Sequence, residues 1–198
     1  MQSSDILEII ETNKRFIESQ SELHPDVVAS QIPIISTSTV DWLAVKPAKY
    51  GRGVFATKPL KMGQYATFYP THQIMRRMNA QDKEWDVISP EGHPNAYKDY
   101  TLTLSPTLRI AGIPSLENLL FCGHLINDPC KDVKIRNSRK LGLQDWLSRY
   151  DNLKPNVEYH IVEDVWAVIK VIRDIEPGEE LTVCYGTSYW IARNNLLV

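Results

Sequence analysis

The sequence predicts a mostly β domain with short helices, which places it in the α+β class. From about residue 31 onward, short runs rich in β-branched and aromatic residues alternate with Pro and Gly, as is typical of strands and turns. Apolar residues at helical spacing occur only in a few short segments. With 198 residues, the chain is long enough for one substantial domain and a flanking element.

An amphipathic helix is expected over residues 5–20, ahead of this domain. Asp5 followed by Glu8 resembles a capping box at its start. Apolar residues then recur at helical spacing, namely Ile6, Ile9, Ile10, Phe16 and Ile17. Packing onto the domain is favoured over binding to a partner. The sequence therefore predicts an N-terminal helical extension, residues 1–30, and a main domain, residues 31–198.

Strands are expected wherever short β-prone runs end at turn residues. In chain order these runs are 32–37, 40–45, 54–56, 65–69, 100–104, 108–111, 159–162 and 165–172. Glu163 and Asp164 separate the last two runs as a hairpin turn. Further helices are expected over 75–85, from Ser115 and Asn118 toward Ile126, over 141–150 and over 188–197.

Composition argues against several classes of function. The net charge of −2 gives no general attraction to nucleic acid or to an anionic membrane. No apolar run is long enough to span a bilayer and the N-terminus lacks a basic signal-peptide start, so an intracellular protein is predicted. Cys122, His124 and Cys130 lack the Cys-x-x-Cys spacing and the fourth ligand of a zinc site. We therefore expect buried thiols and no metal.

Gly51-Arg52-Gly53 is the first of three candidate functional motifs. Its two glycines allow the backbone to approach a ligand closely and leave the backbone amides available. A strand and not a helix follows, so the motif is not a dinucleotide-binding fingerprint. A plain hairpin turn is the alternative interpretation.

The second motif is His124-Leu125-Ile126-Asn127-Asp128-Pro129-Cys130. Taken alone, Asn127 and Asp128 before Pro129 would end a helix and start a turn. A basic cluster follows, formed by Lys131, Lys134, Arg136, Arg139 and Lys140. Such a cluster is usually a solvated loop, and contact with nucleic-acid phosphate or an acidic protein surface is the alternative.

The third motif runs from Gly178 to Trp190. An acidic turn leads into a short β-branched strand that ends at Tyr185-Gly186. Because Gly186 permits a sharp bend, the phenol of Tyr185 is expected at the end of the strand. A structural tyrosine in a core strand is the alternative.

In this order the three motifs resemble the SET-domain protein lysine methyltransferases. The resemblance implies a SET-domain β-clip fold of small sheets, in which the C-terminal segment threads near Asn127 as a pseudoknot. Asp128 stands where the family has His. The Pro-Asn that closes the family motif is found only at Pro155-Asn156, which implies an insertion of about residues 131–154.

The resemblance also implies a function and a site. It implies methyl transfer from S-adenosylmethionine (AdoMet) to a protein lysine, with histone as the default substrate, and a nuclear location if the substrate is chromatin. Tyr185 would be catalytic, and Trp190 would contact adenine, wall the lysine channel or pack in the core. The residues expected to bind AdoMet are Gly51, Arg52, Gly53, Asn127, Asp128 and Trp190. A catalytically inactive SET-fold binding or scaffold protein is the alternative, followed by a β-rich interaction domain that shares only turn residues.

Overall fold

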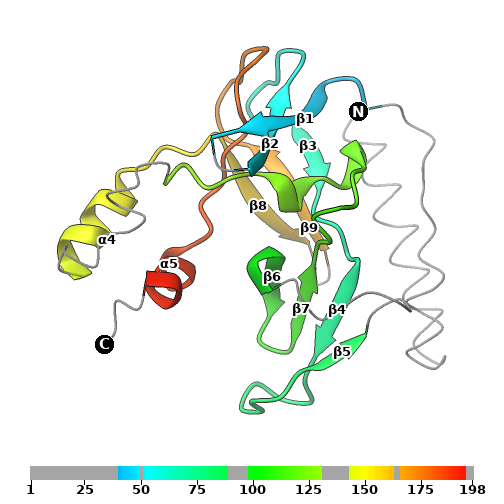
Figure 1. The fold of residues 1–198 in the computed structure, drawn as a ribbon, viewed down its shortest axis with the longest axis vertical. Helices are drawn as coiled ribbons and strands as arrows, with labels where there is room; N and C mark the ends of the chain where they lie inside the picture. Colours follow the sequence, from blue (N-terminus) through cyan, green and yellow to red (C-terminus); the bar gives the residue numbers. More distant parts are fainter. Residues whose placement is uncertain (1–39, 50, 89–97, 131–142, 163–165, 195–198) are drawn as a thin grey trace. The chain divides into compact units, whose positions relative to one another are not determined.

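The computed structural model describes residues 40–49, 51–88, 98–130, 143–162 and 166–194 (Figure 1). The expected helix over 5–20, the strand over 32–37, the basic cluster and the turn at Glu163-Asp164 lie outside these residues. The chain forms two compact units. Unit 1 comprises Met1–Val40, Gln64–His124 and His160–Ile169, and unit 2 comprises Asp41–Gly63, Leu125–Tyr159 and Lys170–Val198. Within the described ranges, no helix is long and apolar enough to cross a membrane.

The first sheet is a hairpin of β1 (Leu43–Ala48) and β2 (Gly51–Ala56) in unit 2. The strands pair in antiparallel fashion, with Leu43 opposite Ala56 and Ala48 opposite Gly51. Gly51 has a φ of 85°, which a glycine adopts without strain at a tight turn. Val54 and Ala56 are fully buried, so this hairpin contributes alternate residues to the core.

A four-stranded antiparallel sheet lies in unit 1, with strand order β5-β4-β7-β6. Its strands are β4 (Gln73–Arg76), β5 (Asp86–Ile88), β6 (Thr101–Ser105) and β7 (Leu108–Ala111). The prediction of a helix over 75–85 is wrong. Ile74 of β4 pairs with both Ile88 and Ile110, so cross-strand packing overrides the local helical pattern.

The third sheet has the strand order β3-β9-β8. Its strands are β3 (Tyr65–Phe68), β8 (Val157–Val162) and β9 (Trp166–Val171), all close to the predicted runs. The central strand β9 is apolar on both faces, and Ala167, Val168, Ile169 and Val171 are almost completely buried. This strand is the centre of the sheet's apolar packing.

The helix expected from Ser115 toward Ile126 is also wrong. The chain forms two short 3₁₀ turns there, η2 (Leu119–Phe121) and η3 (Gly123–Leu125), and a third such turn, η1 (Lys98–Tyr100), precedes β6. Asn118 caps η2, because its side-chain oxygen accepts a hydrogen bond from the Leu120 amide at 3.0 Å. A Cβ at Gly123 would lie 2.9 Å from the carbonyl oxygen of Phe68, so glycine is required here by close backbone contact.

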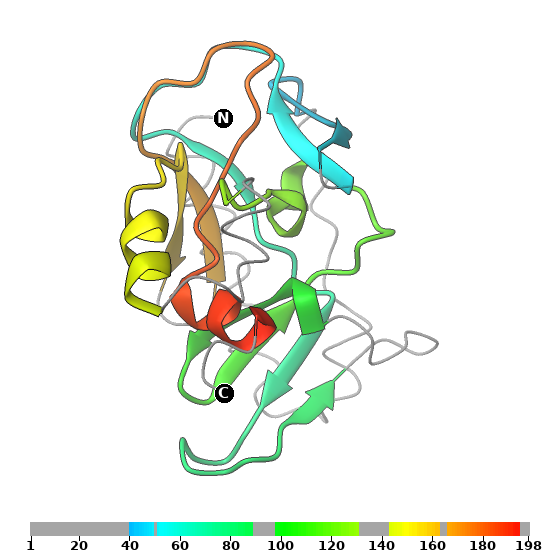
Figure 2. The same cartoon turned by 60° about the vertical axis from the view of Figure 1, so that its left-hand side comes forward.

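Two α-helices in unit 2 confirm the predicted helices over 141–150 and 188–197. They are α4 (Leu143–Asp151) and α5 (Thr187–Asn194), which lie side by side in Figures 1 and 2. Trp146 and Tyr150 are four residues apart on α4 and therefore project from one face of the helix. They form a buried cluster with Trp190 of α5 and with Cys130.

Candidate functional site

The C-terminal segment lies against Asn127, as the resemblance implied. Asn127 and Thr182 form a parallel β-bridge, and the Val183 amide donates a hydrogen bond to the Asn127 carbonyl at 3.0 Å. One residue earlier, the Leu181 amide donates to the Val54 carbonyl of β2 at 2.8 Å. The backbone therefore brings strand β2, Asn127 of the second motif and the third motif together within unit 2.

The side chain of Asn127 ties two of these motifs together. Its amide nitrogen donates one hydrogen bond to the carbonyl of Arg52, at 3.0 Å, and one to Oε1 of Glu180, at 2.8 Å. Because the amide group has two hydrogens, both are used inside the protein. Asn127 thus fixes the glycine turn relative to the C-terminal segment.

The two glycines of the first motif serve different purposes. A Cβ at Gly53 would lie 2.6 Å from Oε1 of Glu180 and 3.0 Å from the Asn127 amide nitrogen. A Cβ at Gly51 would meet nothing within 4 Å, but the φ of 85° would strain any other residue. Gly53 is therefore required by the contact between Asn127 and Glu180, and Gly51 by the turn.

Asp128 is buried, and four hydrogen-bond donors converge on its carboxylate. Oδ1 accepts from the Cys130 amide at 2.7 Å. Oδ2 accepts from the Tyr150 hydroxyl at 2.8 Å, the Tyr185 amide at 2.8 Å and the Trp190 indole at 3.0 Å. A carboxylate with only donors around it suits this position, since it is acceptor-only when ionised. Asp128 thereby connects α4, α5 and the third motif.

Tyr150 links the predicted insertion to the third motif. Its hydroxyl accepts a hydrogen bond from the Gly186 amide at 3.0 Å while donating its own hydrogen to Asp128. Burial and the neighbouring Asp128 carboxylate both raise the pKa of Tyr150 well above its ordinary value, so the phenol keeps its proton. The ring stacks on Trp146, with ring centroids 5.0 Å apart.

Tyr185 is half-buried, and both its backbone and its side chain are held. The amide donates to Asp128, and the hydroxyl donates to the Ile126 carbonyl at 2.9 Å. The ring lies parallel to Trp190, at a centroid distance of 6.3 Å, and edge-on to Tyr189, at 5.1 Å. The following Gly186 has a φ of 95°, so the bend expected after the tyrosine is present.

The predicted site residues are thus brought together, but the side chains of Asn127, Asp128 and Trp190 form hydrogen bonds with other groups of the protein. The indole of Trp190 is buried among protein groups and bound to Asp128. Sequence reasoning missed Tyr150, Glu180 and the carboxylate contacts of Asp128. The spacing of Trp146 and Tyr150 on one helix face was the only local signal for the first of these.

Asn156, the second residue of the displaced Pro-Asn, also lies in this site. Its side-chain oxygen accepts from the Thr182 amide at 2.7 Å, and its amide nitrogen donates to the Glu180 carbonyl at 2.8 Å. Asn156 is almost completely buried, so these contacts satisfy groups that water does not reach. Asn156 therefore holds the C-terminal segment at Glu180 and Thr182, next to the residue that Asn127 binds, Val183.

The backbone of Asp128 differs from the side chains of Asn127 and Asp128 in its hydrogen bonding. The side chains of Asn127 and Asp128 are engaged within the protein, as described above. In contrast, the backbone N–H and C=O of Asp128 make no hydrogen bond within the described part of the chain. An unpaired backbone donor and an unpaired backbone acceptor are groups of the kind that the edge of an adenine ring can bind. Among the described residues, no group of three or more His, Cys, Asp or Glu side chains could hold a metal ion.

The SET-domain family model matches residues 51–186, which is more than half of the chain and includes all three motifs. One solved structure that is similar to the chain is that of a proposed histone methyltransferase from Plasmodium falciparum. The two share 15% sequence identity over 75% of this chain and 96% of that chain, with a TM-score of 0.40. No curated protein matches the sequence.

Proposed function

Because the chain belongs to the SET-domain family, whose members are in general lysine methyltransferases, we propose that it transfers a methyl group from AdoMet to a protein lysine. The observation that carries this proposal is the double anchoring of Tyr185. Asp128 holds its backbone amide and the Ile126 carbonyl holds its hydroxyl. Because the backbone and the hydroxyl of this residue are both held, the phenol can position a reacting amine with little further loss of conformational entropy.

The hydroxyl of Tyr185 is suited to hold the lysine nitrogen. Its hydrogen is directed to the Ile126 carbonyl, and a hydroxyl oxygen that donates in this way is also able to accept an N–H of the amine. The nucleophile must be the neutral amine, whereas free lysine has a pKa of about 10.4. Exclusion of water from the amine would disfavour the ammonium form by desolvation, and the half-buried ring of Tyr189 beside Tyr185 is an apolar surface that could contribute to this.

When bound, AdoMet supplies a methyl group on a positively charged sulfur. Transfer would form the nitrogen–carbon bond and break the carbon–sulfur bond, whose electron pair would remain on the departing neutral thioether, and the lysine nitrogen would have to lose its ammonium proton before the attack. No group of the protein is covalently modified in this reaction. Positioning of the amine by Tyr185 is therefore expected to supply much of the rate.

Residues of the first two motifs would hold AdoMet mainly through the backbone. The Gly51-Arg52-Gly53 turn leaves little side-chain bulk on one side of the site. The unpaired backbone N–H and C=O of Asp128 would meet the adenine edge, so the aspartate in place of the family's histidine does not remove this contact. Asn127 would act by holding the turn in place, and Trp190 by supporting Tyr185.

A histone is the default substrate in this proposal, with a nuclear location if chromatin is methylated. The basic cluster at 131–140, which lies outside the described residues, would then contact nucleosomal phosphate or remain a solvated loop. A catalytically inactive SET-fold scaffold is the second candidate. The observation in its favour is that the Asp128 side chain, at a motif position, is fully used for internal hydrogen bonds.

Isothermal titration calorimetry with AdoMet and tritiated-methyl transfer to histones or a peptide array separate these candidates. Tyr185→Phe should lower turnover by at least about 100-fold while the dissociation constant of AdoMet changes little, because only a positioning hydroxyl is lost. Tyr189→Phe, the same chemical change on the neighbouring ring, is the matched control and should retain activity. Equal turnover of Tyr185→Phe and the wild type would contradict the catalytic role. AdoMet binding without any methyl transfer would favour the scaffold.

A further inference from the structure

Two guanidinium groups lie against the ring of Trp85 in unit 1. The central carbon of Arg77 lies 4.6 Å from the ring centroid, and that of Arg109 lies 4.0 Å from it. Met75 of β4 pairs with Arg109 of β7 and with Val87 of β5. Arg77 is two positions after Met75, and Trp85 is two positions before Val87, so each lies one residue beyond the end of its strand. Because alternate residues share a face, this places both beside Arg109, as their contacts show.

Arg77 is held rigidly by neutral acceptors. Its Nε donates to the Pro106 carbonyl at 2.6 Å, and its Nη1 donates to the Asp82 carbonyl at 2.7 Å. Both acceptors are backbone oxygens, so they orient the guanidinium without neutralising its charge. Nη2 makes no hydrogen bond within the described residues.

Arg109 lies beside this fixed charge and is itself only half-exposed. Its Nε is buried and has no hydrogen-bond partner within the described chain. The two Nη groups are not buried in this way, so they form the edge that reaches solvent. Burial, together with the charge of Arg77, lowers the pKa of Arg109, which means that the native fold places two like charges together at a cost.

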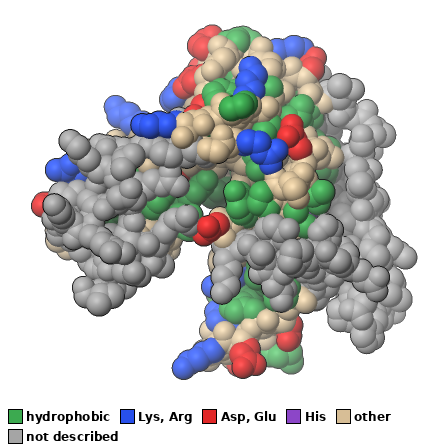
Figure 3. All heavy atoms as spheres, viewed as in Figure 1, with side chains coloured by type: hydrophobic (Ala, Val, Ile, Leu, Met, Phe, Trp, Pro, Cys, Tyr) green, Lys and Arg blue, Asp and Glu red, His purple; other side chains and the backbone are tan. Residues whose placement is uncertain are grey.

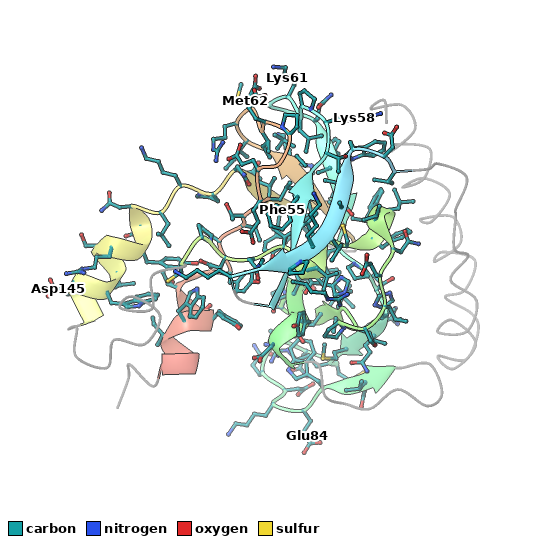
Figure 4. The ribbon with its side chains drawn as sticks, turned by 45° about the horizontal axis from the view of Figure 1, so that its top comes forward. Phe55, Lys58, Lys61, Met62, Glu84 and Asp145 are labelled. Atoms are coloured by element: carbon teal, nitrogen blue, oxygen red, sulfur yellow. The ribbon has the colours of Figure 1, made fainter. Side chains whose placement is uncertain are left out.

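No carboxylate compensates for this pair of charges in the described part of the chain. Neither guanidinium forms an ion pair there. The side-chain oxygen of Asp82 accepts from the Asn79 amide instead. Glu84, the carboxylate next to Trp85 in sequence, projects away from the ribbon at the tip of the β4–β5 connection (Figure 4). Asp86 pairs with Arg76, one residue out of phase, and so lies on the opposite face.

From these contacts we propose that Arg77, Arg109 and Trp85 form a binding site for an oxyanion, either a phosphate or a carboxylate, carried by a polypeptide. Guanidinium groups with unused, solvent-facing N–H groups bind such anions through two parallel hydrogen bonds. An anion would also relieve the repulsion between the two arginines. This site is independent of the proposed methyl transfer.

A polypeptide fits this site better than a nucleic acid does. Nucleic-acid surfaces need an extended basic stripe, whereas the chain has a net charge of −2, and acidic and basic side chains are interspersed on the face shown in Figure 3. The ring of Trp85 is already stacked against guanidinium groups, so it is not a vacant platform for a base.

The test uses the full-length chain and three peptides that differ at one position, which carries phosphoserine, glutamate or alanine. Titration calorimetry at constant ionic strength should show binding of the phosphoserine or the glutamate peptide and none of the alanine peptide. The stronger of the two identifies the anion as phosphate or carboxylate. Arg109→Met keeps an unbranched stem against Trp85 but removes the charge, and it should weaken binding by at least about tenfold, as expected for a charged hydrogen-bonded group.

Arg76→Met is the matched control, because Arg76 is exposed on the same strand as Met75 but on the opposite face. It makes the same change in net charge and should leave peptide binding within about twofold of the wild type. Arg77→Lys, which keeps the charge but not the fork of donors, tests the geometry and should also weaken binding. The proposal is overturned if no anionic peptide binds, if Arg76→Met and Arg109→Met lose binding equally, or if an oligonucleotide binds more tightly than either peptide.

Discussion

Asp128 in unit 2 and Arg109 in unit 1 are both charged groups that are partly or wholly withdrawn from water, and the chain treats them in opposite ways. The Asp128 carboxylate accepts four hydrogen bonds from protein donors. The Arg109 guanidinium has a buried Nε without a partner and a second guanidinium as its neighbour. All the hydrogen-bond partners described for Asp128 come from the protein itself, whereas Arg109 would gain its missing partner from a bound anion.

This difference separates a structural role from a binding role. A buried polar group that is fully satisfied fixes the segments around it in one arrangement. A polar group left unsatisfied in a native fold needs a reason, and a ligand is one such reason. Loss of Asp128 should therefore damage the fold, whereas loss of Arg109 should damage only binding.

The largest effect is expected for Asp128→Ala. This change leaves the Tyr150 hydroxyl, the Trp190 indole and the backbone amides of Tyr185 and Cys130 without their acceptor. Buried donors without partners each cost about 1–3 kcal/mol, so the free energy of unfolding should fall by at least about 3 kcal/mol. Urea unfolding followed by tryptophan fluorescence measures this loss.

Asp128→Asn sharpens the same test, because it keeps the shape of the side chain. The amide oxygen would take the place of Oδ2 and accept from Tyr150, Tyr185 and Trp190, so that its nitrogen faces only the Cys130 amide. The asparagine variant should therefore lose less stability than the alanine variant, namely about 1–3 kcal/mol for the one donor left without an acceptor. Wild-type stability of Asp128→Asn would show that the fold does not depend on the pattern of donors around this residue.

Tyr150→Phe should have the second largest effect. The ring can still stack on Trp146, but the hydroxyl that joins the Gly186 amide to Asp128 is lost. The expected decrease in the free energy of unfolding is about 1–3 kcal/mol, the usual range for leaving a buried partner unsatisfied. A loss as large as that of Asp128→Ala would show that the ring itself had moved, which near-UV circular dichroism would detect.

The same residue gives a pH dependence with a definite sign. The pKa of Tyr150 is raised in the folded state, mainly by burial and also by Asp128, from an ordinary value of 10.0. Its contribution to stability is therefore fully present below that value and is lost as the pH rises toward the folded pKa, because the unfolded tyrosine ionises first. Between about pH 9 and about pH 11, wild-type stability should decline more steeply than that of Tyr150→Phe. Parallel curves would contradict this.

The sequence predicted the regular elements best where periodicity was local. Strands β7 and β8 and helices α4 and α5 lie close to their predicted ranges, since each carries its own pattern of apolar residues. The helix predicted over 75–85, within a polar and irregular segment, does not form. Pairing of β4 with β7, more than thirty positions away in sequence, decided the outcome instead.

The contacts of the candidate site were likewise predicted only in part. The meeting of Asn127 with the C-terminal segment was predicted only from the resemblance to a family, and it is confirmed by the Asn127–Thr182 bridge. The partners of Asp128 could not be predicted, because Tyr150, Tyr185 and Trp190 lie 22, 57 and 62 positions from it. No local rule connects a carboxylate to donors at such separations, so only the fold reveals them.

A smaller effect is expected at the glycine turn, which tests whether side-chain contacts or backbone conformation fix the first motif. Gly53→Ala places a Cβ against Glu180 and Asn127, and the flexible carboxylate can partly move aside. Gly51→Ala meets no atom but has to adopt a φ of 85°. Each should cost about 1–2 kcal/mol of stability. Only Gly53→Ala should also weaken AdoMet binding in calorimetry, since it alone disturbs Asn127; equal weakening by both would contradict the division of roles.

The smallest effect on stability is expected for Arg109→Met, the counterpart of Asp128→Ala in this comparison. The change removes a stacking interaction with Trp85, which is worth about 0.5–1 kcal/mol, and it also removes the repulsion from Arg77. These two terms oppose each other, so the free energy of unfolding should stay within about 1 kcal/mol of the wild type. Added salt should raise the free energy of unfolding of the wild type relative to that of Arg109→Met, because salt screens the repulsion between the arginines more than the stacking on Trp85. Urea unfolding at low and high salt, with Arg76→Met as the control, measures both quantities. A loss of stability as large as that of Asp128→Ala would mean that Arg109 is a structural residue, and the contrast between the two charged groups would no longer hold.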